Sequence, residues 1–238
     1  MNMTARERII IPLDVPSAEE AAGIVARLKG RVGMFKVGLE LYTAAGPDVV
    51  CRIAEQGERV FLDLKLHDIP NTVAKATAVA ARLGAAMIDF HLGGGARMLE
   101  ASRQAVDSAG LSATERPILL GITVLTSFDR DDLVSVGVND RVEDQVTRLA
   151  RLGRAAGLDG VVASPHEVSA IRSACGPRFV IVTPGIRPAG ASYGDQRRVM
   201  TPRDAIDAGS DYLVIGRPIL EARDPVAAVE SIVAEISS

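Results

Sequence analysis

Short apolar runs alternate with stretches of helical period along the whole chain. The runs are rich in β-branched residues and lie at 8–15, 34–41, 59–66, 87–92, 117–125, 160–163, 179–183 and 211–215. Runs of this length predict strands that are buried on both faces, as in a parallel sheet. The stretches between them, for example 16–30 and 69–84, have the amphipathic period of helices, and a final helix is expected at 224–236. The pattern therefore predicts eight β–α units.

Eight such units in 238 residues fit a (β/α)8 TIM barrel, which typically has about 250 residues. A doubly wound open sheet of eight strands is the alternative, and periodicity alone does not separate the two. The sequence has no linker, low-complexity tract or shift in composition that would mark a second domain. We therefore expect one α/β domain that spans residues 1–238.

Charge and hydropathy narrow the class of protein. The chain has 27 Lys and Arg against 30 Asp and Glu, so it lacks the basic surface with which most nucleic-acid-binding proteins hold phosphates. It has no apolar stretch of 18 residues and no signal peptide at its N-terminus, so no membrane partner is expected. Its two cysteines, Cys51 and Cys175, cannot form a disulfide framework. We expect a cytoplasmic protein with reduced thiols.

Charged residues interrupt the third apolar run. Asp63 and Lys65 stand two positions apart, so in a regular strand they point to the same face. Asp14 and Lys36 arrive from the first two runs, and Asp68 follows just past the third. A structural salt bridge would explain one buried pair, but desolvation makes several pairs costly to bury. An array that alternates the lysines with Asp63 and Asp68 would keep every member ionised near neutral pH, which suits a proton-donating lysine.

The last two strands lead into segments suited to phosphate binding. The seventh run continues into PGIR, which ends at Arg187, and the eighth into GRP, which begins at Gly216. Barrels often hold phosphate with the loops after these two strands and a following helix N-terminus. Gly216 allows a close backbone approach, and Arg217 can add a bidentate contact. The polar segment 188–200 is expected to be a lid or binding loop rather than a solvated insertion.

The other polar features of the sequence give weaker predictions of a functional site. No metal site is expected, because the three histidines lie far apart without an acid at metal-ligand spacing. The three glycines at 93–95 lack the spacing of a dinucleotide-binding fingerprint, and no cofactor is expected. Thr126 and Ser127 could bind the amide-like edge of a ring, although a helix-capping turn explains them equally well.

Seven segments together resemble the orotidine 5′-phosphate decarboxylase family: IIPLDVPS (10–17), FKVGLEL (35–41), FLDLKLHDIPNTV (61–73), LTS (125–127), TPGIRP (183–188), GDQRRVMTP (194–202) and YLVIGRPI (212–219). They span nearly the whole chain. The resemblance implies a TIM barrel that converts orotidine 5′-phosphate to uridine 5′-phosphate (UMP) and carbon dioxide in de novo pyrimidine biosynthesis. It also implies that the enzyme uses no cofactor and forms a homodimer.

The same resemblance implies roles for the charged residues. Lys65 would donate a proton to C6 of the pyrimidine after carbon dioxide leaves, and Asp63 would lie beside the substrate carboxylate. Lys36 would link that aspartate to the ribose, which Asp14 would also bind. Asp68 would reach into the active site of the neighbouring subunit.

Further positions match the substrate contacts of the family. Thr126 and Ser127 fall where the pyrimidine edge is read, and Thr72 lies in a binding segment. The phosphate and lid contacts would be made by Arg187, Gln196, Gly216 and Arg217. The chain departs from the family pattern at HLGG (91–94), where many relatives have His-Ala followed by Ser or Ala, but this change affects no residue with an assigned chemical role.

Two alternative functions stay open. A magnesium-dependent sugar-phosphate decarboxylase or synthase on the same barrel would share Asp63, Lys65 and Asp68, but it would carry a metal-binding acid on the second strand, where this chain has Lys36. A catalytically silent phosphosugar-binding barrel would be expected to have lost Asp63 or Lys65, and both are present.

Overall fold

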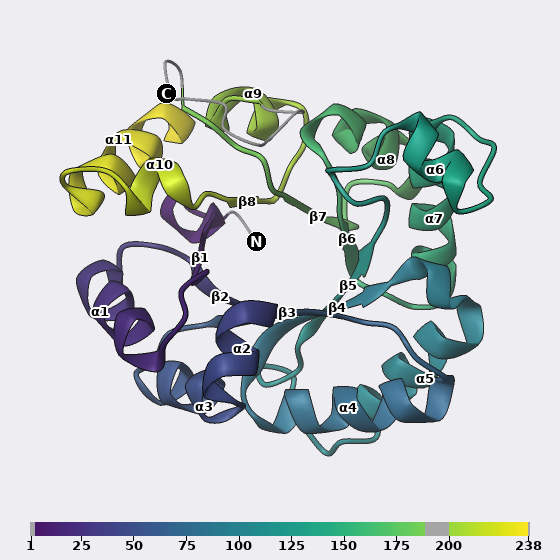
Figure 1. Cartoon of the computed structure of the whole chain (residues 1–238), viewed down its shortest axis with the longest axis horizontal. Helices are drawn as coiled ribbons and strands as arrows, with labels where there is room; N and C mark the ends of the chain where they lie inside the picture. The colour runs from purple at the N-terminus through teal and green to yellow at the C-terminus, as the bar shows by residue number, and fades with distance from the viewer. Residues whose placement is uncertain (1–2, 189–199, 238) are drawn as a thin grey trace.

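Eight parallel strands form a closed barrel in the computed structural model, which describes residues 3–188 and 200–237 (Figure 1). Each strand pairs with its neighbours in sequence, and β1 closes the sheet against β8. The strands are β1 (Ile9–Pro12), β2 (Met34–Gly38), β3 (Val60–Leu66), β4 (Ala85–His91), β5 (Ile118–Ile122), β6 (Gly160–Val162), β7 (Val180–Thr183) and β8 (Tyr212–Val214). The predicted TIM barrel is confirmed, and its closure excludes the open sheet.

Helices surround the barrel as an outer ring (Figure 1). They are α1 (Ala18–Leu28), α2 (Leu39–Ala45), α3 (Asp48–Glu55), α4 (Pro70–Arg82), α5 (Ala96–Asp107), α6 (Arg130–Ser135), α7 (Val142–Ala155), α8 (Val168–Cys175), α9 (Pro202–Asp207), α10 (Arg217–Leu220) and α11 (Pro225–Ser237), with 3-10 turns η1 (Arg6–Arg8), η2 (Leu92–Gly94) and η3 (Pro165–Glu167). Capping residues set their starts: Ser17 and Thr201 each accept a hydrogen bond from a backbone amide in the first turn of α1 and α9.

The apolar runs supply two layers of core. Inward-facing side chains fill the barrel, and they are Ile10, Met34, Phe61, Met87, Leu120, Val182 and Tyr212. The alternate positions, such as Ile9 and Ile11 of β1, pack under the helices. Because both faces of each strand are buried, the runs are apolar throughout rather than alternating with polar residues. The middle of the barrel is therefore solid, and the loops at its ends are left for ligand binding.

Some boundaries differ from the sequence pattern. The fifth run was expected to continue to residue 125, but β5 ends at Ile122, so Thr126 lies in the following loop. Both cysteines lie in helices and both are free, Cys175 being buried and Cys51 half-buried. Within the part of the chain that the structure describes, no helix is both long enough and apolar enough to cross a membrane.

Candidate active site

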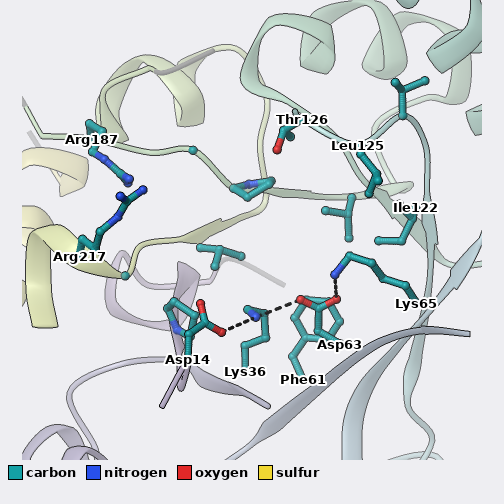
Figure 2. Close-up of a pocket in the computed structure, with 17 residues that line it drawn as sticks. Asp14, Lys36, Phe61, Asp63, Lys65, Ile122, Leu125, Thr126, Arg187 and Arg217 are labelled. Carbon is teal, nitrogen blue, oxygen red and sulfur yellow. Dashed lines mark hydrogen bonds and ion pairs between the residues drawn. The ribbon is translucent and has the colours of Figure 1, made fainter. Parts of the chain in front are cut away.

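A cavity of about 280 Å³ opens at the carboxyl ends of the strands (Figure 2). Apolar side chains from three strands line part of its wall: Phe61 of β3, Ile122 of β5 and Val162 of β6. Most of the residues proposed from the sequence also line it, namely Asp14, Lys36, Asp63, Lys65, Thr126, Arg187, Gly216 and Arg217. The closed barrel thus brings charged residues from both ends of the chain to one cavity.

Asp14, Lys36, Asp63 and Lys65 form a continuous chain of ion pairs, called here the charged array. Lys36 Nζ lies 3.2 Å from Oδ1 of Asp14 and 3.0 Å from Oδ2 of Asp63. Lys65 Nζ donates a short hydrogen bond to Oδ1 of Asp63. The central side chains, Lys36 and Asp63, are each 11 % exposed, whereas Lys65 is 31 % exposed at the cavity. Asp63 therefore binds one lysine with each of its oxygens.

The electrostatics of the array keep its inner members charged. Burial alone would raise the pKa of Asp63, but a hydrogen bond with Asp89 and the positive charges of Lys36 and Lys65 outweigh it, so the pKa lies well below the usual range. Burial likewise opposes protonation of Lys36, yet the carboxylates of Asp63 and Asp14 raise its pKa above the ordinary value. Asp63 and Lys36 are therefore both ionised near neutral pH.

Strand β3 is irregular just before it ends. Leu62 pairs with Ile88 of β4, and Leu66 pairs with Phe90, so residues 63–65 lie opposite a single residue of β4. Lys65 has a φ of +50°, in the left-handed region, unlike every other described residue that is not glycine. The ladder is therefore irregular here, yet Asp63 and Lys65 both line the cavity, so the prediction that they point to the same face is confirmed.

Two arginines lie on the side of the cavity opposite Lys65. Figure 2 shows the guanidinium groups of Arg187 and Arg217 pointing toward one another, across the cavity from Asp63 and Lys65. Arg187 is buried and donates a hydrogen bond from Nη1 to the backbone oxygen of Ile186 at 2.9 Å. Gly216 directly precedes α10, and a Cβ at this position would lie 2.8 Å from Cγ of Pro12, so β8 and β1 approach closely here.

Three further proposed residues, Asp68, Thr72 and Ser127, do not line the cavity. Asp68 is exposed just beyond β3, and its Oδ1 accepts a hydrogen bond from the amide of Ile69 at 2.6 Å. Thr72 is exposed in the first turn of α4, and Ser127 is exposed next to Thr126. Gln196, and with it most of the 188–200 segment, lies outside the described residues.

The described part of the chain has no cluster of side chains suited to a metal ion at the cavity. No group of three His, Cys, Asp or Glu side chains there could hold a metal ion. The rings of His67 and His91 lie 5.5 Å apart, centroid to centroid, and burial lowers the pKa of His91. Where a divalent ion would need a carboxylate on β2, the ammonium group of Lys36 is present.

The sequence model of one protein family, described as "Orotidine 5'-phosphate decarboxylase / HUMPS family", matches residues 7–232. The chain belongs to this family. Among relatives named orotidine 5'-phosphate decarboxylase, the protein of Moorella thermoacetica is 56 % identical over 99 % of this chain and 94 % of its own length. That of Trichlorobacter lovleyi is 52 % identical over 98 % of this chain and 96 % of its own length. The crystal structure of orotidine 5'-phosphate decarboxylase from Lactobacillus acidophilus matches with a TM-score of 0.87 and 37 % identity, over 97 % of this chain and 99 % of that one.

The departure from the orotidine 5'-phosphate decarboxylase pattern at residues 91–94 affects packing rather than the cavity. Leu92 is fully buried, and its side chain occupies the space that Cβ atoms at Gly121 and Gly153 would need. A Cβ at Gly121 would lie 2.5 Å from Cδ2 of Leu92. Two glycines on neighbouring elements thus accommodate the larger side chain.

Asp89 lies beside the site but was not among the residues predicted from the sequence. Asp89 is fully buried in β4, and its Oδ1 accepts a hydrogen bond from the backbone amide of Lys65 at 2.8 Å. The signal that could have revealed it is the one that singled out Asp63, an acidic residue inside an apolar strand.

Proposed function

We propose that this protein decarboxylates orotidine 5′-phosphate to UMP and carbon dioxide, as the printed names of its relatives state for those proteins. Membership of the family supports the reaction class. The observation that carries the proposal is the charged array of Asp14, Lys36, Asp63 and Lys65, which faces a pair of arginines across one cavity. The array suits the reacting end of the substrate and the arginines suit its phosphate.

Lys65 is the proposed proton donor. Cleavage of the bond between C6 and the carboxylate releases carbon dioxide and leaves the electron pair on C6. The ammonium group of Lys65 stabilises this negative charge and then gives a proton to C6. Its salt bridge to Asp63 supports the role, because it holds the ammonium group at the wall of the cavity. No group other than Lys65 needs to change its protonation state in this sequence of steps.

Asp63 and Lys36 are proposed to prepare the site. An Asp63 carboxylate that stays ionised lies where the substrate carboxylate would approach, and the repulsion between them favours loss of carbon dioxide. Lys36 holds this carboxylate in place and links it to Asp14, which is proposed to bind the ribose. Asp63 and Lys36 thus contribute by fixing charges in place before the reaction begins.

Phosphate binding is assigned to Arg187, Arg217 and the backbone at Gly216. Two guanidinium groups on one wall of a cavity can form charge-assisted hydrogen bonds with a phosphate dianion. Thr126 lines the cavity where the pyrimidine edge would lie, with Ser127 next to it. Thr72 and Gln196 are proposed as further substrate contacts, and binding of the remote phosphate is expected to contribute to catalysis and not only to affinity.

A second copy of this chain is the proposed partner. The apolar side chains of Leu39, Ile69 and Val79 are exposed by 57 %, 65 % and 49 % on the elements around Asp68. Surfaces of this kind favour association, and a symmetric dimer would bring Asp68 to the cavity of the other subunit. We also propose that each subunit is a single domain and that the protein is cytoplasmic.

A direct assay tests the function. Purified protein is mixed with orotidine 5′-phosphate without added metal, and the loss of substrate absorbance in the ultraviolet is followed. Decarboxylation is expected, whereas no turnover of orotidine 5′-phosphate together with magnesium-dependent activity on a sugar phosphate would favour the alternative enzyme on this barrel.

A further inference from the structure

Asp89 is a buried acid that no step of the proposed reaction uses. It is fully buried in β4, where its main chain pairs with Leu120 of β5. Oδ1 accepts the hydrogen bond from the backbone amide of Lys65 at 2.8 Å. Oδ2 makes no hydrogen bond of ordinary geometry within the described chain, although the side chain of Asp89 also interacts with the Asp63 carboxylate. An acid in this position needs a reason, because burying a carboxyl group is costly.

The irregularity of β3 explains why a carboxyl group is buried at position 89. Residues 63–65 lie opposite Asp89 alone, so the regular ladder between β3 and β4 is interrupted at this point. A buried amide that loses its ladder partner must find another acceptor. The side chain of Asp89 is that acceptor for Lys65, whose left-handed backbone is otherwise disfavoured in a residue with a Cβ.

We propose that Asp89 is a positioning residue, which fixes the irregular turn of β3 and thereby directs the ammonium group of Lys65 to Asp63 and the cavity. The hydrogen bond between Asp89 and the Lys65 amide is seen in the structure. The expected effect of Asp89 on turnover rests on the proposed function. Asp89 lines no part of the cavity, so it acts on the substrate only through the residues that it contacts, Lys65 and Asp63.

The role needs an acceptor oxygen and not a negative charge. The pKa of Asp89 is raised well above its ordinary value, first by burial and then by the neighbouring Asp63 carboxylate, although Lys65 partly offsets this. A neutral carboxylic acid accepts a hydrogen bond from the amide with its carbonyl oxygen. Asparagine has a carbonyl oxygen at the same position of its side chain and can accept the same hydrogen bond. Asp89→Asn should therefore preserve the function, whereas Asp89→Leu removes the acceptor.

A matched control exists at the opposite end of the barrel. Oδ2 of Asp159 accepts a hydrogen bond from the backbone amide of Leu119 at 2.8 Å, the same kind of contact at the same distance. Asp159 directly precedes β6 and lies away from the cavity. Asp159→Leu thus measures what loss of a carboxylate–amide contact does to the barrel in general.

The experiment compares kcat and KM for orotidine 5′-phosphate in the three variants and the wild type. Asp89→Leu is expected to lower kcat on the order of 100-fold while KM changes by about twofold or less, because the reacting group is displaced but the phosphate site is intact. Asp89→Asn should stay within about fivefold of wild type in kcat. Asp159→Leu should lower the melting temperature with kcat unchanged. Should Asp89→Leu fail to fold, Asp89→Ser, whose side chain is shorter, takes its place with the same expected loss.

Hydrogen exchange of the Lys65 amide gives a readout that does not depend on activity. The amide should exchange slowly in the wild type and in Asp89→Asn, and quickly in Asp89→Leu. Fast exchange in the wild type, a kcat in Asp89→Leu close to the wild-type value, or a rise in KM as large as the fall in kcat would each overturn the proposal. A wild type without decarboxylase activity would instead refute the proposed function, while the exchange rates would still decide whether Asp89 holds Lys65.

Discussion

Lys36 Nζ lies 3.0 Å from Oδ2 of Asp63, and both side chains are almost completely withdrawn from solvent. Opposite charges buried in this way gain attraction but lose hydration, and the sum is often close to zero or unfavourable. Stability therefore does not explain the pair. The pair is explained by its effect on Asp63, which stays a carboxylate and so holds the ammonium group of Lys65 in place beside the cavity.

Replacing Lys65 removes the proposed proton donor and the main positive charge for the carbanion. Lys65→Ala is expected to lower kcat by on the order of 1,000-fold or more with the fold intact. Circular dichroism and the ultraviolet assay check the two halves of this expectation. Lys29→Ala, on an exposed residue that follows α1, is the control for loss of a lysine. Turnover of Lys65→Ala within tenfold of wild type would show that the assignment is wrong.

Chelation separates the two enzymes that this barrel could support. The proposed chemistry depends on the ammonium group of Lys65, and Lys36 opposes a divalent ion at the end of β2. Activity should therefore survive exhaustive treatment with EDTA, measured in the same assay before and after dialysis. Loss of activity that magnesium restores would move the assignment to the sugar-phosphate enzymes.

The raised pKa of Asp89 predicts an unusual dependence of the free energy of unfolding on pH. Its pKa is raised above the ordinary value of 3.8, so above about pH 4 the folded protein keeps a proton that the unfolded chain has lost. This contribution makes the protein less stable as the pH rises through the window between the two values. Asp89→Asn cannot titrate, and it should gain stability over the wild type at about pH 7 but not at about pH 3.

Thermal unfolding of both proteins at several pH values tests this. Asp63 and Lys65 are the charged groups that act on Asp89, and the substitution leaves both in place. Asp159→Asn is the control, because it should lose stability by weakening the ion pair with Arg103 at 3.2 Å. Parallel curves for the wild type and Asp89→Asn from about pH 3 to about pH 7 would contradict the raised pKa.

The sequence predicts the barrel well because each buried strand is an apolar run, and it reveals Asp63 and Lys65 because charges stand out in such a run. It does not reveal the break in β3, since a left-handed Lys65 has no signature in residue order. The sequence shows that Asp89 is an acid inside an apolar strand, but it does not show its role, because its partner is a backbone amide on another strand and only the three-dimensional register brings the two together.

Arg217 should matter for the phosphate and not for the base. Loss of hydrogen bonds to a charged group costs about 1.5–3 kcal/mol, so Arg217→Ala should weaken binding of UMP by about 10- to 100-fold and leave binding of uridine nearly unchanged. Titration calorimetry with both ligands measures this. Arg116→Ala removes an exposed arginine just before β5, at the far end of the barrel, and should affect neither ligand. Equal losses for UMP and uridine would remove Arg217 from the phosphate site.

Mixing of inactive variants tests whether Asp68 acts across a dimer. Asp68 is exposed and lies outside the cavity of its own barrel, whereas Lys65 lines it. In a dimer that joins Lys65→Ala with Asp68→Ala, one site would collect both lesions and the other would regain its lysine and its aspartate. Random exchange makes about half of the dimers mixed, so roughly a quarter of all sites should recover wild-type composition.

The pair of Lys65→Ala and Asp63→Ala provides the matched control for this experiment. Lys65 and Asp63 contact each other within one chain, so no mixed dimer of these two variants contains an intact site. Recovery is therefore expected with Asp68→Ala and not with Asp63→Ala, with native mass spectrometry confirming exchange in both mixtures. If Asp68 acted within its own barrel, the two mixtures would stay equally inactive, because every site would still lack either the lysine or the aspartate of its own chain.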